Sequence, residues 1–117
     1  MAVSIVENWS EIEGIICALN LPTQLRNFTG MEVVVESVKP VAGFPNLLQD
    51  ASGKKLAILA PTELLNQLDA HPGDRITCRV RRGGPHQIFI HQMFISIEPG
   101  DSIPDSCADP DPSGGPM

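Results

Sequence analysis

The chain has 117 residues, of which 42% are hydrophobic and 19% charged, and its formal net charge is −6 at pH 7. This length and composition indicate one globular domain and exclude two ordinary domains or a chain that is disordered throughout. No apolar run approaches the roughly 20 residues of a membrane-spanning helix, and the N-terminus lacks the basic start typical of a signal peptide. We therefore expect a cytoplasmic protein that does not associate with membranes.

The three cysteines are odd in number and widely spaced. Cys17, Cys78 and Cys107 lie in no CxxC or Cys/His pattern typical of a zinc site. We expect reduced thiols, in keeping with a cytoplasmic location.

The acidic charge is unevenly distributed. Residues 1–98 carry eight Lys and Arg against ten Asp and Glu, a difference of −2, whereas residues 99–117 hold the other four acids and five of the eleven prolines. Such a Pro/Gly-rich segment cannot bury enough apolar surface to offset its ordering entropy. We predict a single domain over 1–98 and a disordered acidic tail over 99–117. The nearly neutral domain does not exclude an anionic partner.

Hydrophobic patterning predicts short strands and one helix. Apolar and β-branched runs favour strands over 12–19, 31–39, 54–60, 75–80 and 87–97. A stretch that contains proline and glycine follows the second strand and predicts a bend, with a turn at Ser52-Gly53. Residues 61–71 favour a helix, because a proline suits its first turn and three leucines form an apolar stripe. A glycine-containing turn over 81–85 joins the last two strands.

This order of elements predicts a mainly β fold. Five short strands with one helix between the third and the fourth are typical of a small OB-like Greek-key barrel, the oligonucleotide/oligosaccharide-binding type. An SH3-like barrel is the alternative.

The strand over 75–80 places arginines on one face. Ile76, Cys78 and Val80 alternate with polar residues and should point into the core, which makes Cys78 a small buried hydrophobe. The opposite face carries Arg75, Arg79 and Arg81. This face is either a solvated surface or a binding surface for an anionic partner.

The strand ends in the sequence Arg81-Arg82-Gly83-Gly84. A glycine turn beside guanidinium groups forms a concavity that suits oxyanions, because backbone N–H groups and arginine forks both donate to them. Glycine pairs are also common in hairpin turns for conformational reasons alone.

Two stretches share a pattern with a known family: "QLRNFTGMEVVV" and "GKKLAILAPTELLNQLDAHPGDRITCRVRR". Arg26-Asn27, Gly30 before a valine-rich strand, and Gly73-Asp74 before the next strand resemble the TOBE/Mop family of molybdate-binding domains, over about residues 22–83. The family's opening serine and alanine are Gln24 and Leu25 here. Its closing Lys-Ala-Ser is Arg81-Arg82-Gly83.

The resemblance implies the OB-like barrel, a homo-oligomer with ligands at subunit interfaces, and a bound molybdate-like oxyanion. By this resemblance, and by the charge at the turn, the oxyanion would contact Arg26, Arg81, Arg82 and the Gly83 amide. No other cofactor is expected.

A second hypothesis is an interaction module for single-stranded nucleic acid or an acidic protein partner. The arginine face would contact the partner, and aromatic side chains would stack on bases. The residues of this alternative face are Arg75, Arg79, Arg81, His86, Phe89 and His91. Two questions stay open: whether Phe89 and His91 or Ile88 and Ile90 point inward, and whether Trp9 closes the barrel or anchors an interface.

Catalysis finds no support in the sequence. No Ser/His/Asp set, phosphate-binding loop or distinctive pair of carboxylates is visible. His86 and His91 lie five apart on one strand and so face opposite sides, which argues against a shared metal. We predict a protein that is not an enzyme and has no catalytic residues and no metal site.

Overall fold

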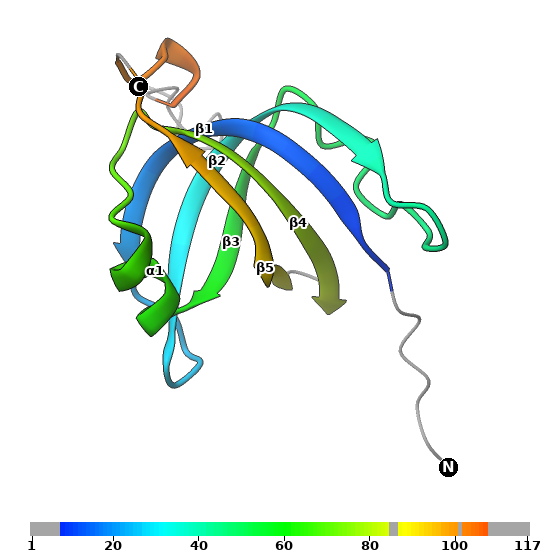
Figure 1. Cartoon of the computed structure of the whole chain (residues 1–117), viewed down its shortest axis with the longest axis horizontal. Helices are drawn as coiled ribbons and strands as arrows, with labels where there is room; N and C mark the ends of the chain where they lie inside the picture. The colour runs from blue at the N-terminus through cyan, green and yellow to red at the C-terminus, as the bar shows by residue number, and fades with distance from the viewer. Residues whose placement is uncertain (1–7, 85–86, 101, 108–117) are drawn as a thin grey trace, which may run out of the picture.

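The computed structural model describes residues 8–84, 87–100 and 102–107 (Figure 1). Its strands are β1 (Ser10–Leu21), β2 (Phe28–Pro40), β3 (Lys55–Pro61), β4 (Arg75–Gly84) and β5 (Gln87–Glu98). The helix α1 (Thr62–Leu68) follows β3, and a short 3-10 helix, η1 (Asp105–Cys107), follows β5. The mainly β class and the helix between the third and fourth strands are confirmed.

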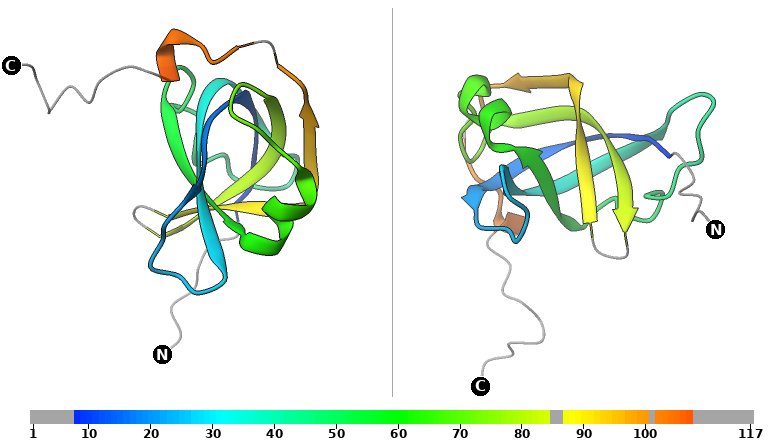
Figure 2. Two further views of the ribbon diagram at one scale, coloured as in Figure 1. Left: turned by 90° about the vertical axis from the view of Figure 1, so that its left-hand side faces the viewer. Right: turned by 90° about the horizontal axis from the view of Figure 1, so that it is seen from below.

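The five strands close into a barrel in the order β1-β2-β3-β5-β4, and β4 returns to β1. Neighbouring strands are antiparallel except β3 and β5, which meet in a short parallel contact with Leu59 opposite Phe89. The left view of Figure 2 shows the strands curling around a common interior. Because the sheet closes on itself, few strand edges remain to pair with other chains.

The interior is filled by alternate residues of every strand. Successive side chains of a β-strand point to opposite faces of the sheet, so every second residue of each strand points into the core. The largest fully buried side chains are Ile12, Ile16, Met31, Val33, Val35, Ile58, Ile76, Cys78 and Val80. The predicted inward set of the fourth strand, Ile76, Cys78 and Val80, is therefore confirmed.

The long strands bend sharply to follow the barrel. β1 pairs with both β2 and β4, and its register against β2 shifts between Glu13 and Gly14. A Cβ atom added at Gly14 would lie 2.2 Å from the carbonyl oxygen of Val34. Only glycine fits this close approach of two backbones, and it allows the bend.

The helix α1 is shorter than the 61–71 that the sequence predicts. Pro61 remains the last residue of β3, and Asp69 adopts a left-handed conformation (φ 52°) that ends the helix. Leu65 joins the core, and Leu64 and Leu68 pack against it. The short helix therefore covers part of the barrel interior. No helix in the described ranges has the length and apolar character needed to cross a membrane.

The structure describes part of the segment after residue 98, for which the sequence predicts a disordered tail. Pro99, Gly100 and residues 102–107 have a defined course along the barrel, and Cys107 forms a disulfide with Cys17 of β1. The expectation of reduced thiols is wrong for these two cysteines. Reduced thiols therefore no longer support the prediction of a cytoplasmic location. The remaining tail residues, 101 and 108–117, lie outside the described residues.

The last strands also differ from the prediction. The sequence predicts a turn over 81–85, but residues 81–84 belong to β4, which continues to Gly84. Pro85 and His86 lie outside the described residues.

Truncation of a core side chain tests the barrel interior. Ile58 is fully buried, so Ile58→Ala removes apolar contacts and leaves a cavity, and we expect it to lower the free energy of unfolding by about 2–5 kcal/mol. The matched control is Leu47→Ala, since Leu47 is exposed and its loss should change stability by less than about 0.5 kcal/mol. Urea unfolding measures both, and equal losses would contradict this core.

Candidate binding groove

The arginine face of β4 points outward, as predicted, but much of its charge is neutralised. Arg75 forms an ion pair with Glu36 of β2 and lies 4.0 Å from a carboxylate oxygen of Glu13. The hydrogen bond with Glu36 raises the pKa of the Arg75 guanidinium. Arg79 Nε lies 3.4 Å from Glu11 Oε1. Two of the three arginines thus form cross-strand pairs with acids of β1 and β2.

A groove lies where β4 and β5 approach their connection. Its volume is about 470 Å³, and it is lined by residues from before β1, from the start of β2, from the end of β3 and from β4 and β5. The aromatic and cationic members of this lining are Trp9, Phe28, Phe89, His91 and Arg81. We call it the aromatic groove.

The rings of this region contact one another. The Trp9 and His91 centroids are 4.8 Å apart, and Phe28 meets Phe89 edge-on at 5.8 Å. His91 in turn meets Phe94 edge-on at 5.0 Å. Such offset and edge contacts are the favoured geometry of aromatic pairs, so the rings hold one another in place.

Two arginines of β4, Arg79 and Arg81, lie over aromatic rings. The guanidinium carbon of Arg79 is 3.9 Å from the centroid of Phe94, and that of Arg81 is 5.9 Å from the centroid of Trp9. Both distances suit a cation–π interaction. Arg81 is exposed, so its charge stands at the rim of the aromatic groove.

An irregularity of β5 brings these rings to the surface. Cys78 pairs with Ile95 and Val80 pairs with Ile90, so one residue of β4 stands opposite the four residues 91–94 of β5. The Met93 amide donates a hydrogen bond to His91 Nδ1 within this bulge. Met93 is 84% exposed and Phe94 is also exposed. The bulge therefore presents side chains that a regular strand would pair.

The question that the sequence left open for β5 is answered by burial. Ile88 and Ile90 are buried in the core, whereas Phe89 and His91 line the aromatic groove. Phe44 and Phe94 are exposed. Trp9 is half-buried in the groove wall.

Asn8 fixes the end of β4 beside this wall. Its side-chain Nδ2 donates to the carbonyl oxygen of Arg82, and its Oδ1 accepts from the Arg82 amide at 2.9 Å. Asn8 is buried. Its side chain makes with the Arg82 backbone the two hydrogen bonds that the backbone of a neighbouring strand would otherwise make. This pairing sets Trp9 beside Arg81, and nothing in the sequence around Asn8 indicates it.

The four predicted oxyanion contacts do not all line the aromatic groove. Arg26 is exposed in the connection between β1 and β2, and only Arg81 of the four residues lines the aromatic groove. The Arg82 backbone is bound by Asn8. A Cβ atom added at Gly83 would lie 2.6 Å from the Phe89 ring, so glycine is needed here because that ring packs on the backbone.

The groove lining offers aromatic rings, an imidazole and one guanidinium. No cluster of three or more His, Cys, Asp or Glu side chains able to hold a metal ion occurs among residues 8–84, 87–100 and 102–107. No protein-family model matches the chain, and no curated protein matches it. The resemblance to the TOBE/Mop family therefore stays a prediction.

The buried thiol of Cys78 provides a test of the core beneath this face. Burial raises the pKa of Cys78 to about 12, so below that pH the native thiol stays neutral, and only the thiolate reacts with iodoacetamide. We expect no alkylation of Cys78 in the native protein at mildly alkaline pH and complete alkylation in denaturant, measured by mass spectrometry. Rapid labelling of the native thiol would contradict its burial.

Proposed function

We propose that this protein is a non-enzymatic binding module with an OB-type barrel, and that it binds single-stranded nucleic acid in the aromatic groove. The strand order β1-β2-β3-β5-β4, the parallel contact of β3 with β5 and the helix between β3 and β4 support the OB type over an SH3-like barrel. OB barrels bind oligonucleotides and oligosaccharides beside the connections β1–β2 and β4–β5.

The observation that carries the proposal is the composition of the groove at that place. Phe28 begins β2 directly after the first of these connections, while Arg81 and Phe89 flank the second. Together with Trp9 and His91 they offer flat rings with a cation at the rim. Stacking of a base on an aromatic side chain contributes about 1–3 kcal/mol and tolerates any base, because every base has a π-face.

The charges on the arginine face of β4 determine how strongly the affinity for a nucleic acid depends on salt concentration. Arg75 and Arg79 are paired with acids, so Arg81 is left as the exposed cation of the arginine face. Each phosphate contact contributes about −0.7 to the slope of log K against log salt for a single strand. With one or two such contacts the slope is shallow, about −1, and stacking supplies most of the affinity.

A small oxyanion remains the second candidate ligand. The exposed guanidinium of Arg81 at the rim of a groove favours it, and the proposed contacts are still Arg26, Arg81, Arg82 and the Gly83 amide. An acidic protein partner, and a homo-oligomer with ligand at its interfaces, also remain predictions.

Trp9 is the only tryptophan of the chain, so its fluorescence reports directly on the groove. Titration with an oligothymidine of about ten nucleotides, within the usual site size of one OB barrel, should quench this fluorescence to saturation. Phe89→Ala and His91→Ala should each weaken the binding about tenfold, the loss of about 1.4 kcal/mol of stacking.

The matched control is Phe44→Ala, which removes an exposed aromatic side chain that does not line the groove and should leave the affinity unchanged. Circular dichroism of each variant confirms its fold. Absence of quenching by the oligonucleotide would contradict the proposal. If molybdate, but not sulfate, then raised the melting temperature, the oxyanion candidate would replace it.

A further inference from the structure

The outer face of β1 and β2 carries apolar side chains that are covered. Ile15 pairs with Val34 of β2 and with Arg75 of β4, and all three point away from the core, opposite to the inward Ile16 and Val33. Yet Ile15 is only 9% exposed and Val34 only 6% exposed. Something outside the barrel therefore shields them.

The cover is the segment that follows β5. We call residues 99–100 and 102–107 the strap, drawn in orange tones in Figures 1 and 2. Gly100 and Ser102 lie beside Ile15 and Gly73, and Pro104 and Ser106 lie beside Val34 and Val35. The strap thus runs from the end of β5 across β1 to β2.

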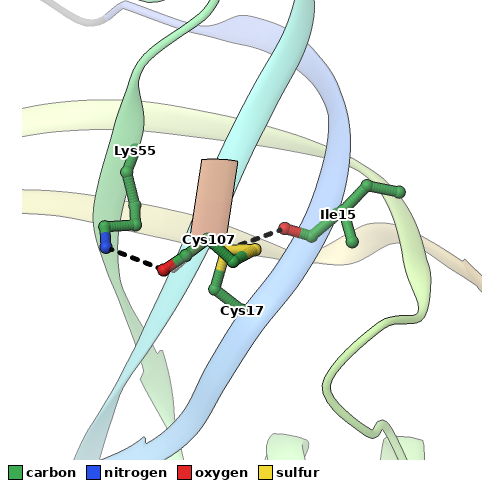
Figure 3. Close-up of a disulfide and its surroundings, with 4 residues drawn as sticks. All are labelled: Ile15, Cys17, Lys55 and Cys107. Carbon is green, nitrogen blue, oxygen red and sulfur yellow. Dashed lines mark hydrogen bonds between the residues drawn. A yellow bond between two sulfur atoms is a disulfide. The ribbon is translucent and has the colours of Figure 1, made fainter. Parts of the chain in front are cut away.

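Among the described residues, two hydrogen bonds join the strap to the barrel. The Gly100 amide donates to Asp74 Oδ1 at 3.2 Å, and Lys55 Nζ donates to the carbonyl oxygen of Cys107 at 3.3 Å. Most strap side chains are exposed, Ile103 included. Figure 3 shows the covalent tie at its far end, where Cys107 meets Cys17 on β1.

Fixing eight residues costs conformational entropy, which two exposed hydrogen bonds and a few apolar contacts do not offset. The disulfide makes the bound strap favourable because it confines the strap to the barrel surface. Both cysteines are only half-buried, so a reductant can reach them. The third cysteine, Cys78, is buried in the core and cannot exchange with the pair.

We propose that the Cys17–Cys107 disulfide is a redox latch, whose reduction by a dithiol releases the strap and exposes the apolar face of Ile15 and Val34. In the first step a thiolate of the dithiol attacks one sulfur, forms a mixed disulfide and displaces the other cysteine as a thiolate, which takes up a proton. The second thiol of the reductant, as its thiolate, then displaces the first cysteine, which is protonated in turn, and closes the reductant's own disulfide. Two electrons pass from the dithiol to the protein.

The latch and the aromatic groove lie at opposite ends of β4 and β5. The groove adjoins the connection after Gly84, whereas the strap starts after Glu98, which pairs with Arg75. The inference therefore does not rest on the proposed function. Reduction should uncover Ile15 and Val34 on the outer face of β1 and β2 without changing the fluorescence response of Trp9 to oligonucleotides.

Hydrogen exchange with mass spectrometry tests the latch on the full chain, before and after treatment with dithiothreitol. We expect amides of residues 99–107 to exchange at least about tenfold faster after reduction, while peptides from the β2 and β3 core keep their protection. Cys17→Ser and Cys107→Ser should show the fast exchange without reductant and no further response to it. Ser106→Ala, which keeps the disulfide, should behave like the original protein.

Three results would overturn the inference. One is an air-oxidised protein in which both Cys17 and Cys107 can be alkylated without reduction. Another is a strap that exchanges equally slowly after reduction, which would show that its noncovalent contacts suffice. The third is loss of protection throughout the barrel, since the disulfide would then stabilise the whole fold instead of fastening one segment.

Discussion

The barrel depends on its closure between β3 and β5. These strands meet in a short parallel contact, with Leu59 opposite Phe89, and α1 and β4 form the connection that a parallel pairing requires. Without this contact the interior around Ile58 and Ile90 would open at one seam and leave two exposed edges. The same contact fixes Phe89 on the outer surface, where it lines the aromatic groove.

The groove follows from how β4 and β5 accommodate that closure. Gly83 lets the Phe89 ring lie against the β4 backbone, and the bulge over residues 91–94 lifts His91 and Phe94 out of the regular ladder. Asn8 then completes the pairing of Arg82 and brings Trp9 to the same place. Gly83, the bulge over residues 91–94 and the hydrogen bonds of Asn8 with Arg82 together bring the aromatic rings to one surface.

Much of the fold could be predicted from the sequence, because alternating apolar residues specify strands and their inward faces independently of tertiary contacts. The inward set Ile76, Cys78 and Val80 is an example. The site could be predicted only in part. Arg81, Phe89 and His91 were identified from residue type, but pairing of Arg75 with Glu36 and the contact of Asn8 with Arg82 join residues far apart in the chain. The disulfide was missed for the same reason, since Cys17 and Cys107 are separated by 90 positions.

The central claim is that the aromatic groove is the ligand site, and NMR chemical-shift mapping tests it most directly. A ¹⁵N-labelled full chain would be titrated with oligothymidine, and the perturbed amides located on the barrel. The account predicts that the largest shifts belong to the backbone of Trp9, Phe28, Phe89 and His91 and to the Trp9 indole. Shifts confined to Arg26 and its connection, to the strap, or absent altogether would contradict it.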